Sequence, residues 1–424
     1  MKWLYLIIDL FGWWCSEYVL NFLHPDHTLP WYAFVFVVFF FYLFECYDRA
    51  HFTRKLKHVL KLLLAVLLAG MFLSFTSFWA PFIGVSRLQL FGVIFLFALF
   101  AVTWRALVGH LLGKEPVVPL VLIGCSKDER FLEYLDDDER FHVFQKIDDY
   151  NAIDFNDVVV NPCIVCDFSE YESSETARFN FEKRLVDLRM SGIKVYDVQG
   201  FYQRFWDKVA IYNLSHAWFL FSPGFTLALH PYYRRLKRVF DIIVASVGLI
   251  LASPFFLIVP ILIRMESEGT VMFRQERVGL NAKCFDVLKF RSMCVDAEKD
   301  GAQWAQTNDP RVTGVGCWLR KLRIDELPQL INVLRGEMSL IGPRPERPVF
   351  VEQLEKEIPF YQMRHLVKPG VTGWAQVNHP YGSSVDDAVK KLEYDLFYVK
   401  NYSLLLDVRI LLRTVRVVLF GKGQ

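Results

Sequence analysis

Four apolar runs, separated by short polar segments, fill the first quarter of the chain. They cover residues 3–23, 31–47, 59–79 and 88–108. Each run is close to the ~20 residues that an α-helix needs to cross ~30 Å of hydrocarbon. The pattern therefore predicts a membrane α-helical bundle of four transmembrane helices in residues 1–112.

Basic residues in the loops indicate how this bundle is oriented. Segment 24–30 has none, segment 80–87 has only Arg87, and segment 48–58 holds Arg49, Arg54, Lys55 and Lys57. Short loops rich in lysine and arginine stay on the cytoplasmic side. We therefore expect the loop at 48–58 and everything after residue 110 to be cytoplasmic.

The pattern changes over residues 116–222, where short apolar runs alternate with amphipathic ones. The predicted strands are Val117–Gly124, Asp157–Asp167 and Gly192–Val198, and the predicted helices are Asp128–Leu135 and Ser174–Met190. This alternation is typical of a parallel sheet with crossover helices, so we expect a small Rossmann-like α/β domain. The glycines that let a backbone approach a pyrophosphate are missing after Gly124, so we expect no nucleotide there.

A further apolar segment, Ile242–Ile263, has basic residues on both sides and Ser253-Pro254 near its middle. Proline removes one helix hydrogen bond and clashes with the carbonyl of Ile250, while Ser253 can bond the backbone groups set free. A re-entrant helix over 238–264 and a kinked spanning helix both fit this pattern. We favour the re-entrant helix, because a crossing would place the carboxylate pair described below outside the cell, away from nucleotide sugars and Mg²⁺.

The terminal run Leu404–Phe420 carries Arg409, Arg413 and Arg416 on one helical face, because four and three residues separate them. Its apolar residues lie mostly elsewhere. Two interpretations fit this pattern. One is a helix in the membrane interface, and the other is a helix packed on the domain core with a solvated arginine stripe.

Composition supports a membrane protein and excludes some functions. The chain has 424 residues, of which 53% are hydrophobic, and its mean hydropathy is +0.24. The net charge of only +2 gives no sign of bulk nucleic-acid binding. The eight cysteines are scattered, and Cys163 and Cys166 lack a second pair or a nearby histidine for a zinc site. We therefore expect a reducing cytosol and packed thiols.

The candidate chemistry lies in residues 232–424. Asp325 and Glu326 stand just before a predicted short helix that begins near Pro328 and ends at Gly336. The free N–H groups at a helix start favour anions and keep a carboxylate ionised, which a nucleophile attacking phosphorus requires. Adjacent acids before a helix are also common as simple helix caps, so this pattern alone does not distinguish a catalytic pair from a cap.

Cationic residues accompany these acids. Arg344 stands between two prolines that restrict its backbone, so its guanidinium loses less freedom when it binds phosphate oxygens. The other cations are Arg274, Arg277, Lys289, Arg291, Arg311, Arg320 and Arg323. Any one of them could form a structural ion pair. Together with two carboxylates, one of which could bind a divalent metal, the set favours phosphoryl transfer at a membrane.

Eight motifs occur in order along residues 232–424. They are Lys237-Arg238-x-x-Asp241, Ser253-Pro254, Arg274-Gln-Glu-Arg277-x-Gly279, Lys289-Phe-Arg-Ser-Met293, Asp309-Pro-Arg-Val312, Asp325-Glu-Leu-Pro-Gln329, Gly342-Pro-Arg-Pro-Glu346 and Lys368-Pro-Gly-Val-Thr-Gly-Trp-Ala-Gln376. With these eight motifs the chain resembles the bacterial sugar transferases, which are polyprenyl-phosphate sugar-1-phosphate transferases. With its four leading helices and α/β insert, it is similar to the long form of that family. The resemblance implies a mostly α, monotopic catalytic domain whose re-entrant helix bends at Ser253 and Pro254.

The same resemblance implies a two-step exchange. Asp325 would attack the sugar-bearing phosphate of a UDP-sugar and release UMP, and the phospho-sugar would then pass to polyprenyl (undecaprenyl) phosphate. Glu326 would bind Mg²⁺. Lys289 and Asp407 would complete the catalytic network, and Arg344 would contact the nucleotide side. Further substrate-binding candidates are Arg277, Arg291, Arg311 and Arg323.

We therefore expect an enzyme of the bacterial inner (cytoplasmic) membrane that starts a capsule, exopolysaccharide or O-antigen repeat. Its catalytic domain would face the cytoplasm, and we expect a homodimer that binds no nucleic acid. The residues leave the transferred sugar open. Two other classes fit less well. A non-catalytic scaffold has no need of the intact Asp325-Glu326 pair, and a transporter using Asp9 and Glu17 would show paired repeats.

Overall fold

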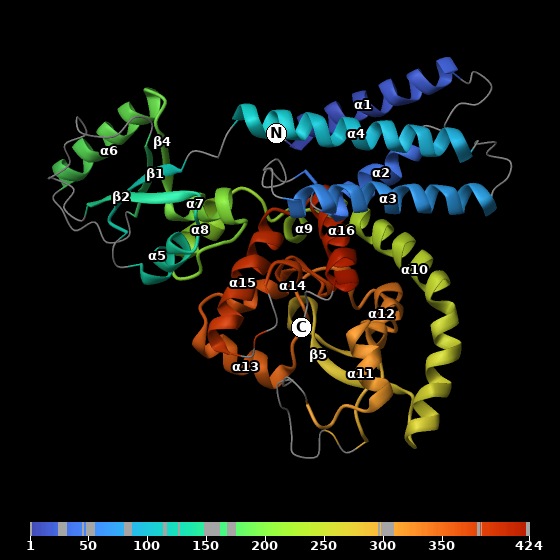
Figure 1. Cartoon of the computed structure of the whole chain (residues 1–424). Helices are drawn as coiled ribbons and strands as arrows, with labels where there is room; N and C mark the ends of the chain where they lie inside the picture. Colours follow the sequence, from blue (N-terminus) through green and yellow to red (C-terminus); the bar gives the residue numbers. More distant parts are fainter. Residues whose placement is uncertain are drawn as a thin grey trace. The chain divides into compact units, whose positions relative to one another are not determined.

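The computed structural model describes residues 2–23, 32–44, 46–47, 56–79, 87–112, 117–125, 128–147, 162–167, 175–295, 297, 309–379, 382 and 384–420. The chain divides into two units, Met1–Pro116 and Val117–Gln424 (Figure 1). The elements described in the first unit are helices. The second unit combines a parallel sheet with a mostly helical part that holds the candidate chemistry.

Helices form at all four apolar runs of the first unit. They are α1 (Lys2–Leu23), α2 (Tyr32–Leu43), α3 (Leu56–Trp79) and α4 (Arg87–Leu112). Ala65, Ala69 and Ala101 are fully buried and let the helix backbones approach one another, whereas large side chains such as Phe75 and Phe95 are exposed. This distribution is expected for helices that face lipid.

Among the described residues of this unit, α3 and α4 are long and apolar enough to cross a membrane. The apolar part of α2, Ala33–Leu43, is shorter. Crossing by α1 and α2 therefore stays a prediction. The orientation also stays a prediction, because Arg49, Arg54 and Lys55 lie outside the described residues.

Asp9, one of the two acids within the first helix, lies in a buried ion pair. Arg105 of α4 donates to its two carboxylate oxygens at 2.9 and 2.7 Å, and Trp104 Nε1 donates at 2.9 Å. Both charged side chains are buried. The pair joins α1 to α4 and satisfies both charges inside the bundle. It supports a structural role for Asp9 rather than a proton path.

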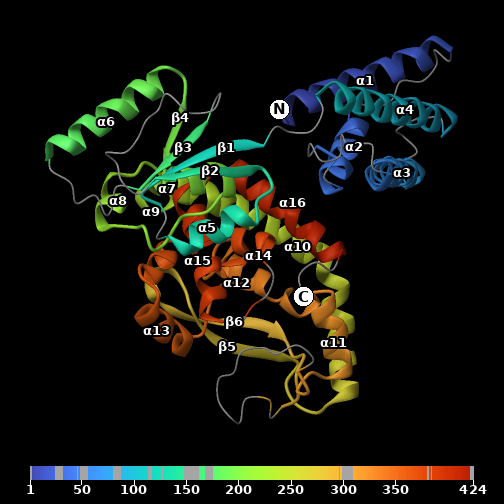
Figure 2. The same cartoon turned by 60° about the vertical axis from the view of Figure 1, so that its left-hand side comes forward.

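The second unit begins with a four-stranded parallel sheet of order β2-β1-β3-β4, formed by β1 (Val118–Ile123), β2 (Phe141–Ile147), β3 (Cys163–Cys166) and β4 (Lys194–Asp197). Leu120 and Leu122 of β1 pack toward α5 (Glu129–Asp136) and α7 (Val198–Phe201), and Val121 and Ile123 pack toward α6 (Glu175–Met190). Helices therefore cover both faces (Figure 2).

The structure confirms a small parallel sheet in this region, although the sequence did not predict β2. The separate Rossmann-like domain stays a prediction. Of the predicted strand at 157–167, only residues 162–167 are described. Cys163 and Cys166 are buried in β3, as expected for packed thiols. Short helices lead on toward the candidate chemistry, namely η4 (Tyr202–Trp206), α8 (His216–Phe221) and α9 (Thr226–Leu229).

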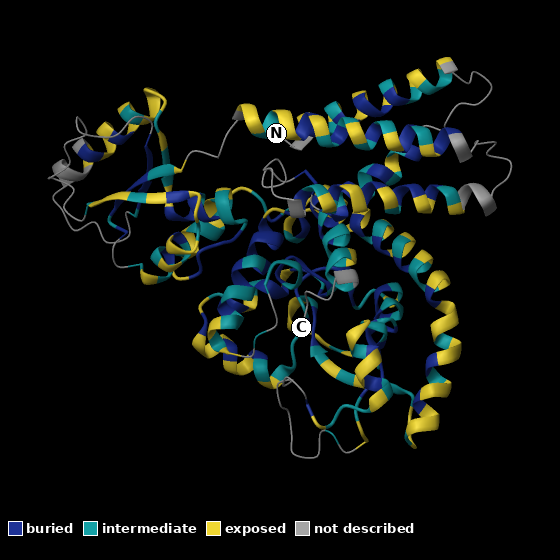
Figure 3. Ribbon diagram, in the orientation of Figure 1, coloured by how far each residue is buried: buried dark blue, intermediate teal, exposed yellow. Residues whose placement is uncertain are grey.

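The long apolar segment forms α10 (Pro231–Glu266), a helix of 36 residues that curves along the helical part (Figure 1). The backbone stays helical through Ser253 and Pro254. The Ser253 hydroxyl donates at 2.8 Å to the carbonyl of Ile250, which Pro254 leaves without its helical donor. Exposed and half-buried residues follow most of α10 (Figure 3), which is long and apolar enough to cross a membrane.

The remaining elements pack beside α10. An antiparallel hairpin of β5 (Met272–Val278) and β6 (Cys284–Phe290) turns through η5 (Leu280–Ala282), and β7 (Ser339–Ile341) pairs in parallel with β8 (Gly370–Thr372). The helices are α11 (Gly314–Lys321), η6 (Ile324–Glu326), α12 (Gln329–Arg335), α13 (Pro348–Glu357), η7 (Tyr361–Leu366), α14 (Trp374–Asn378), α15 (Val385–Lys400) and α16 (Leu404–Phe420). One core joins α10, α12, α15 and α16, so this part is mostly α as predicted.

Helix α16 packs on the core, as one of the two interpretations of the terminal run expects, but its arginines do not form the solvated stripe of that interpretation. Ile410 is fully buried. The guanidinium groups of Arg409 and Arg413 lie 4.9 and 4.8 Å from the ring centroid of Trp374. These arginines therefore cover an aromatic side chain, and the exposed face carries apolar residues such as Leu405 and Val408.

Helix α15 connects the α/β domain to the rest of the second unit. Its Glu393 is buried and accepts hydrogen bonds from Tyr134 of α5 at 2.8 Å, while Lys208 lies 3.4 Å from the carboxylate. Arg130 of α5 also pairs with Asp386 near the start of α15. The buried Glu393 and a more exposed ion pair thus dock the α/β domain, in addition to apolar contact.

Candidate active site

Asp325 and Glu326 lie in η6, a single 3-10 turn between α11 and α12. Arg323 precedes them in a left-handed conformation with φ of 55°, which is uncommon for a residue other than glycine and marks a sharp turn. Helix α12 follows directly, with Pro328 at its start and Gly336 at its end, as predicted. The turn therefore presents two adjacent carboxylates, each only 8% exposed.

Helix α12 is fixed by bonds to two neighbouring elements, and this holds the turn in place. The buried side chain of Asn332 accepts a hydrogen bond from Leu288 N at 3.0 Å and donates to the carbonyl of Asp286 at 2.7 Å, which ties α12 to β6. Arg238 of α10 donates to two carbonyls in the last turn of α12. Long-range contacts therefore position the carboxylates.

Glu326 is surrounded by cations. Arg344 Nη2 donates to Glu326 Oε1 at 2.7 Å, Lys289 Nζ lies 3.4 Å from the same oxygen, and Arg323 Nη1 lies 3.9 Å from Oε2. Burial alone would raise the pKa of Glu326, but these three cations hold it well below its usual range. Glu326 is therefore ionised at every physiological pH.

Asp325 has the opposite surroundings. Within the part of the chain that the structure describes, its side chain makes no hydrogen bond or ion pair. Burial and the neighbouring charge of Glu326 raise the pKa of Asp325 to about 6. Above that pH the group is an ionised carboxylate that accepts no hydrogen bond from the described residues. Such a group is suited to attack an electrophile.

The other predicted substrate-binding arginines have partners of their own. Arg277 donates to Gln275 at 3.0 Å and to the carbonyl of Pro345 at 3.1 Å, close to Arg344. Arg291 is buried and donates to the carbonyls of Ser267 and Glu268, both at 2.8 Å. Arg311 forms an ion pair with Asp309 at 2.5 Å. Of the predicted cations, the structure thus brings Lys289, Arg323 and Arg344 directly to the carboxylate pair.

Asp407 lies in a different cluster. Lys237 Nζ donates to Asp407 Oδ2 at 2.8 Å and lies 3.7 Å from Asp241, and the Tyr398 hydroxyl donates to Asp407 Oδ1 at 2.9 Å. Burial raises the pKa of Asp407, and Lys237 and Tyr398 offset part of this shift. The cluster joins α10, α15 and α16, and its partners do not include Asp325 or Glu326.

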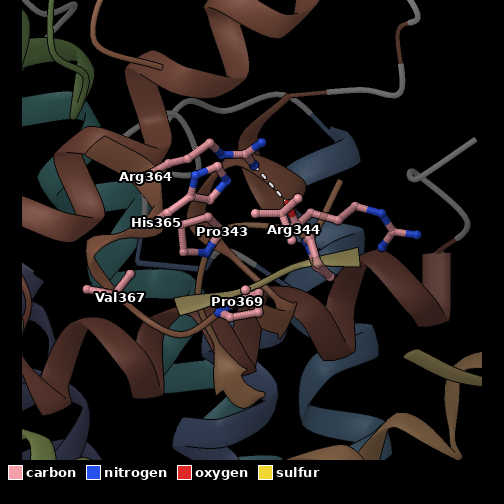
Figure 4. A pocket seen from close by; sticks show the side chains of 9 residues that line it. Pro343, Arg344, Arg364, His365, Val367 and Pro369 are labelled. Carbon is pink, nitrogen blue, oxygen red and sulfur yellow. Dashed lines mark hydrogen bonds between the residues drawn. The ribbon is translucent and has the colours of Figure 1, made fainter. Parts of the chain in front are cut away.

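A small, shallow hollow adjoins the loop that carries Arg344 (Figure 4). Arg364 and His365 of η7 line it, and sequence analysis predicted neither. Burial lowers the pKa of His365 to about 4, so the ring is neutral at physiological pH. Arg364 donates to the carbonyl of Arg344 at 2.9 Å, and the Arg344 guanidinium extends away from it. Arg364 could not be singled out from sequence, because two of its partners, Arg344 and Asp395, lie 20 and 31 residues away.

The carboxylate pair has the donor chemistry that Mg²⁺ uses. This ion commonly takes one or two carboxylates together with water and substrate phosphate oxygens. Glu326 supplies an ionised carboxylate, and Asp325 supplies oxygens that no donor in the described part of the chain occupies. A complete metal cage of three or more His, Cys, Asp or Glu side chains is absent from the described residues. A metal here would therefore depend on substrate and water for its remaining ligands.

Comparison with known proteins agrees with this geometry. The family model for the bacterial sugar transferases matches residues 232–421. The chain is 48% identical over 243 residues to a UDP-N-acetylgalactosamine-undecaprenyl-phosphate N-acetylgalactosaminephosphotransferase of Aeromonas hydrophila, which covers 57% of this chain and 56% of the relative. It is 43% identical over 195 residues to the UDP-glucose:undecaprenyl-phosphate glucose-1-phosphate transferase of Escherichia coli (strain K12), covering 46% of this chain and 42% of the relative.

A shorter relative is matched along nearly its whole length. The exopolysaccharide production protein PSS of Rhizobium leguminosarum bv. phaseoli is 41% identical over 198 residues, which is 44% of this chain and 98% of the relative. The longer relatives are matched over about half of their length or less, at 56% and 42%. The segment that the family model matches contains the carboxylate pair, Arg344 and Asp407.

Proposed function

Because the chain belongs to the bacterial sugar transferase family, we propose that it transfers sugar 1-phosphate from a UDP-sugar to undecaprenyl phosphate and releases UMP. The names of the Aeromonas hydrophila and Escherichia coli relatives support this reaction class. The observation that carries the proposal is the difference in bonding between the two adjacent carboxylates of η6. Glu326 is held by three cations, whereas Asp325 beside it has no hydrogen-bond or ion-pair partner among the residues that the structure describes.

In the first step, a carboxylate oxygen of Asp325 attacks the phosphorus that bears the sugar. A bond forms between this oxygen and phosphorus, the bond from phosphorus to the bridging oxygen breaks, and its electron pair leaves with UMP. Lys289 and Arg344 lie beside the carboxylate pair and would compensate the negative charge of the donor phosphates. Glu326 cannot take the place of Asp325 as readily, since the same cations already occupy it.

In the second step, a phosphate oxygen of undecaprenyl phosphate attacks the same phosphorus. The bond from phosphorus to the Asp325 oxygen breaks, the carboxylate is regenerated, and the sugar diphosphate lipid is released. The covalent intermediate separates two encounters between anionic partners that would otherwise have to occur together. Each displacement then needs only one phosphorylated substrate to be held beside Asp325.

We propose that Glu326 holds Mg²⁺ when substrate is present. The ion would supply Lewis-acid stabilisation of charge on the phosphate oxygens, which in metal-dependent phosphoryl transfer is worth several kcal/mol. The low pKa of Glu326 favours this role, because the carboxylate is always ionised. Binding of Mn²⁺ in place of Mg²⁺, followed by electron paramagnetic resonance, should weaken in Glu326→Gln.

We further propose that α10 is re-entrant and that the catalytic part lies on the cytoplasmic face. Arg234 and Arg235 are exposed near one end of α10, and Arg264 is exposed near the other, so both ends carry accessible positive charge. Cysteine labelling in sealed vesicles, at Tyr233 and at Ser267 in a cysteine-free background, tests this. Labelling from the same side supports a re-entrant helix, and labelling from opposite sides means a crossing.

The reaction itself is tested with detergent-purified protein, Mg²⁺, undecaprenyl phosphate and a panel of UDP-sugars. UDP-N-acetylgalactosamine and UDP-glucose come first, because both sugars occur in the names of the relatives. We expect UMP release that requires the lipid acceptor. Absence of release with every donor would favour a non-catalytic scaffold. Light scattering of the same preparation tests the proposed homodimer.

A further inference from the structure

The loop that carries Arg344 is held by its carbonyl groups. Four successive carbonyls, from Pro343 to Glu346, each accept a hydrogen bond from another element. The donors are Gly370 N at 2.9 Å, Arg364 Nη2 at 2.9 Å, Arg277 Nη1 at 3.1 Å and Val278 N at 2.9 Å. Proline has no N–H to donate, so a loop with prolines on both sides of Arg344 depends on such outside donors.

Arg364 is the donor to the Arg344 carbonyl itself, and it is placed inside the protein for this contact. Its guanidinium is buried, and it also donates to Asp395 Oδ2 at 2.8 Å and to the Tyr361 hydroxyl at 2.6 Å. Asp395 of α15 is buried as well. Burying a guanidinium is unfavourable unless it is paired and hydrogen-bonded, so Asp395 makes this position tenable.

The contact has a direct geometric consequence for the carboxylate pair. The Arg344 backbone is fixed at its carbonyl, and its side chain reaches from that point to Glu326 Oε1 at 2.7 Å. Without the fixed backbone, a long side chain with several rotatable bonds would sample other positions. Precise placement of a cation beside a reacting phosphate raises the rate, because the cation stabilises the negative charge of the transition state.

We propose that Arg364, held by Asp395, is a positioning residue for the transfer reaction, acting through the Arg344 carbonyl to keep the Arg344 guanidinium at the carboxylate pair. Arg364 itself touches no substrate in this scheme. The inference rests on the proposed function. It assigns a role to a buried arginine and to a carboxylate of α15 that sequence motifs did not single out.

A double-mutant cycle tests the proposal. The single variants are Arg364→Lys and Arg344→Lys, combined in one double variant. Lysine keeps the charge beside Asp395 but has one nitrogen, so it cannot bond Asp395, Tyr361 and the Arg344 carbonyl together as the guanidinium does. We expect Arg364→Lys to lower kcat/KM for the UDP-sugar by roughly 10–100-fold. The share of this loss that appears in kcat and the share that appears in KM should be the same as in Arg344→Lys.

The double variant should be no slower than Arg344→Lys alone, within about threefold, because both changes disturb one interaction. Losses that multiply in the double variant would overturn the proposal, as would full activity of Arg364→Lys. Arg140→Lys, which alters an arginine bonded to Asp138 in the α/β domain, serves as the matched control and should be fully active.

Asp395→Asn provides a second route if Arg364→Lys does not fold. It nearly preserves shape and removes the charge that holds Arg364, and the same non-additivity with Arg344→Lys is expected. Multiplying losses would again reject the inference. If the unaltered protein releases no UMP, the proposed function fails. If the unaltered protein is active and the cycle is additive, only the positioning role fails.

Discussion

Asp325 and Asp407 lie in two charged clusters of the same helical part, and their surroundings are opposite. Asp407 is fully buried and is bonded to both Lys237 and Tyr398. Asp325 retains slight exposure and has no bonded partner among the described residues, although three cations contact the adjacent Glu326. The Asp407 carboxylate is bonded to other parts of the fold, whereas the Asp325 carboxylate can bind or react with a substrate.

The difference indicates which charges serve packing and which can serve chemistry. A buried ion pair that loses one partner leaves an uncompensated charge, so the Lys237–Asp407 pair constrains α10 against α16. An unpaired carboxylate at the surface of a cationic cluster stabilises nothing by itself, and its raised pKa means that folding disfavours its charged form. Such a residue is expected at a site where substrate binding or the reaction itself compensates for its unfavourable charge.

Substitution of Asp325 should have the largest effect on activity and should not harm the fold. An amide cannot attack phosphorus, so Asp325→Asn should lower UMP release by at least about 10³-fold. At pH 7.5, above its folded pKa of about 6, the native carboxylate is ionised where burial disfavours charge. The neutral amide should therefore keep or raise the thermal unfolding midpoint.

Assay of UMP release and a thermal melt of the same preparation check this prediction. Asp386→Asn, a change at a half-exposed carboxylate near the start of α15, is the control and should leave UMP release within about twofold, as is usual for surface positions. Wild-type release by Asp325→Asn would remove Asp325 from the mechanism.

Substitution of Asp407 should act on stability. Asp407→Leu removes the acceptor of Lys237 and Tyr398 and leaves a buried lysine without its closest carboxylate, which should cost about 3–5 kcal/mol and lower the thermal midpoint by roughly 10 °C. The double variant Lys237→Met with Asp407→Leu should recover much of this loss, because apolar side chains can replace a buried pair. An unchanged midpoint in Asp407→Leu would show that the pair does not stabilise the fold.

The pH dependence of UMP release should report the availability of Asp325. Its pKa is raised to about 6, so the carboxylate is ionised above that pH and protonated below it. We expect the rate to fall by about tenfold for each pH unit below 6 and to level off above it. A rate that stays constant down to pH 4.5, measured with intact protein confirmed by light scattering, would contradict a raised pKa.

The smallest expected effect belongs to the Tyr398 hydroxyl. Tyr398→Phe removes one donor to Asp407 and leaves the ion pair with Lys237 in place. The loss of a hydrogen bond to a charged group should cost about 1–2 kcal/mol, which lowers the thermal midpoint by a few degrees. A drop as large as that of Asp407→Leu would mean that Tyr398, rather than the ion pair, holds the cluster.

Sequence could predict features that depend on local residues. The start and end of α12 follow from Pro328 and Gly336, and the four apolar runs of the first unit are helical. The bond from Ser253 to the Ile250 carbonyl also follows from positions close in sequence. Motifs in the last half of the chain indicated the family, which the comparisons confirm.

Features that depend on distant contacts could not be predicted. Asp407 meets Lys237 across 170 residues, and the bond from Arg364 to Arg344 joins separate elements. The family resemblance therefore grouped Asp407 with the reacting carboxylates, a role that stays a prediction, and Arg364 was not singled out. Arg291 shows the same limit, because only the fold reveals that its guanidinium binds carbonyls after α10.

The central claim is that Asp325 becomes covalently bound to the sugar phosphate during turnover. The most direct measurement incubates the protein with a UDP-sugar and Mg²⁺ without lipid acceptor, quenches it in acid, and maps the modified peptide by mass spectrometry. We predict one added sugar phosphate on Asp325 that disappears after undecaprenyl phosphate is supplied. An adduct on Glu326 or Asp407, or UMP release without any adduct, would contradict the account.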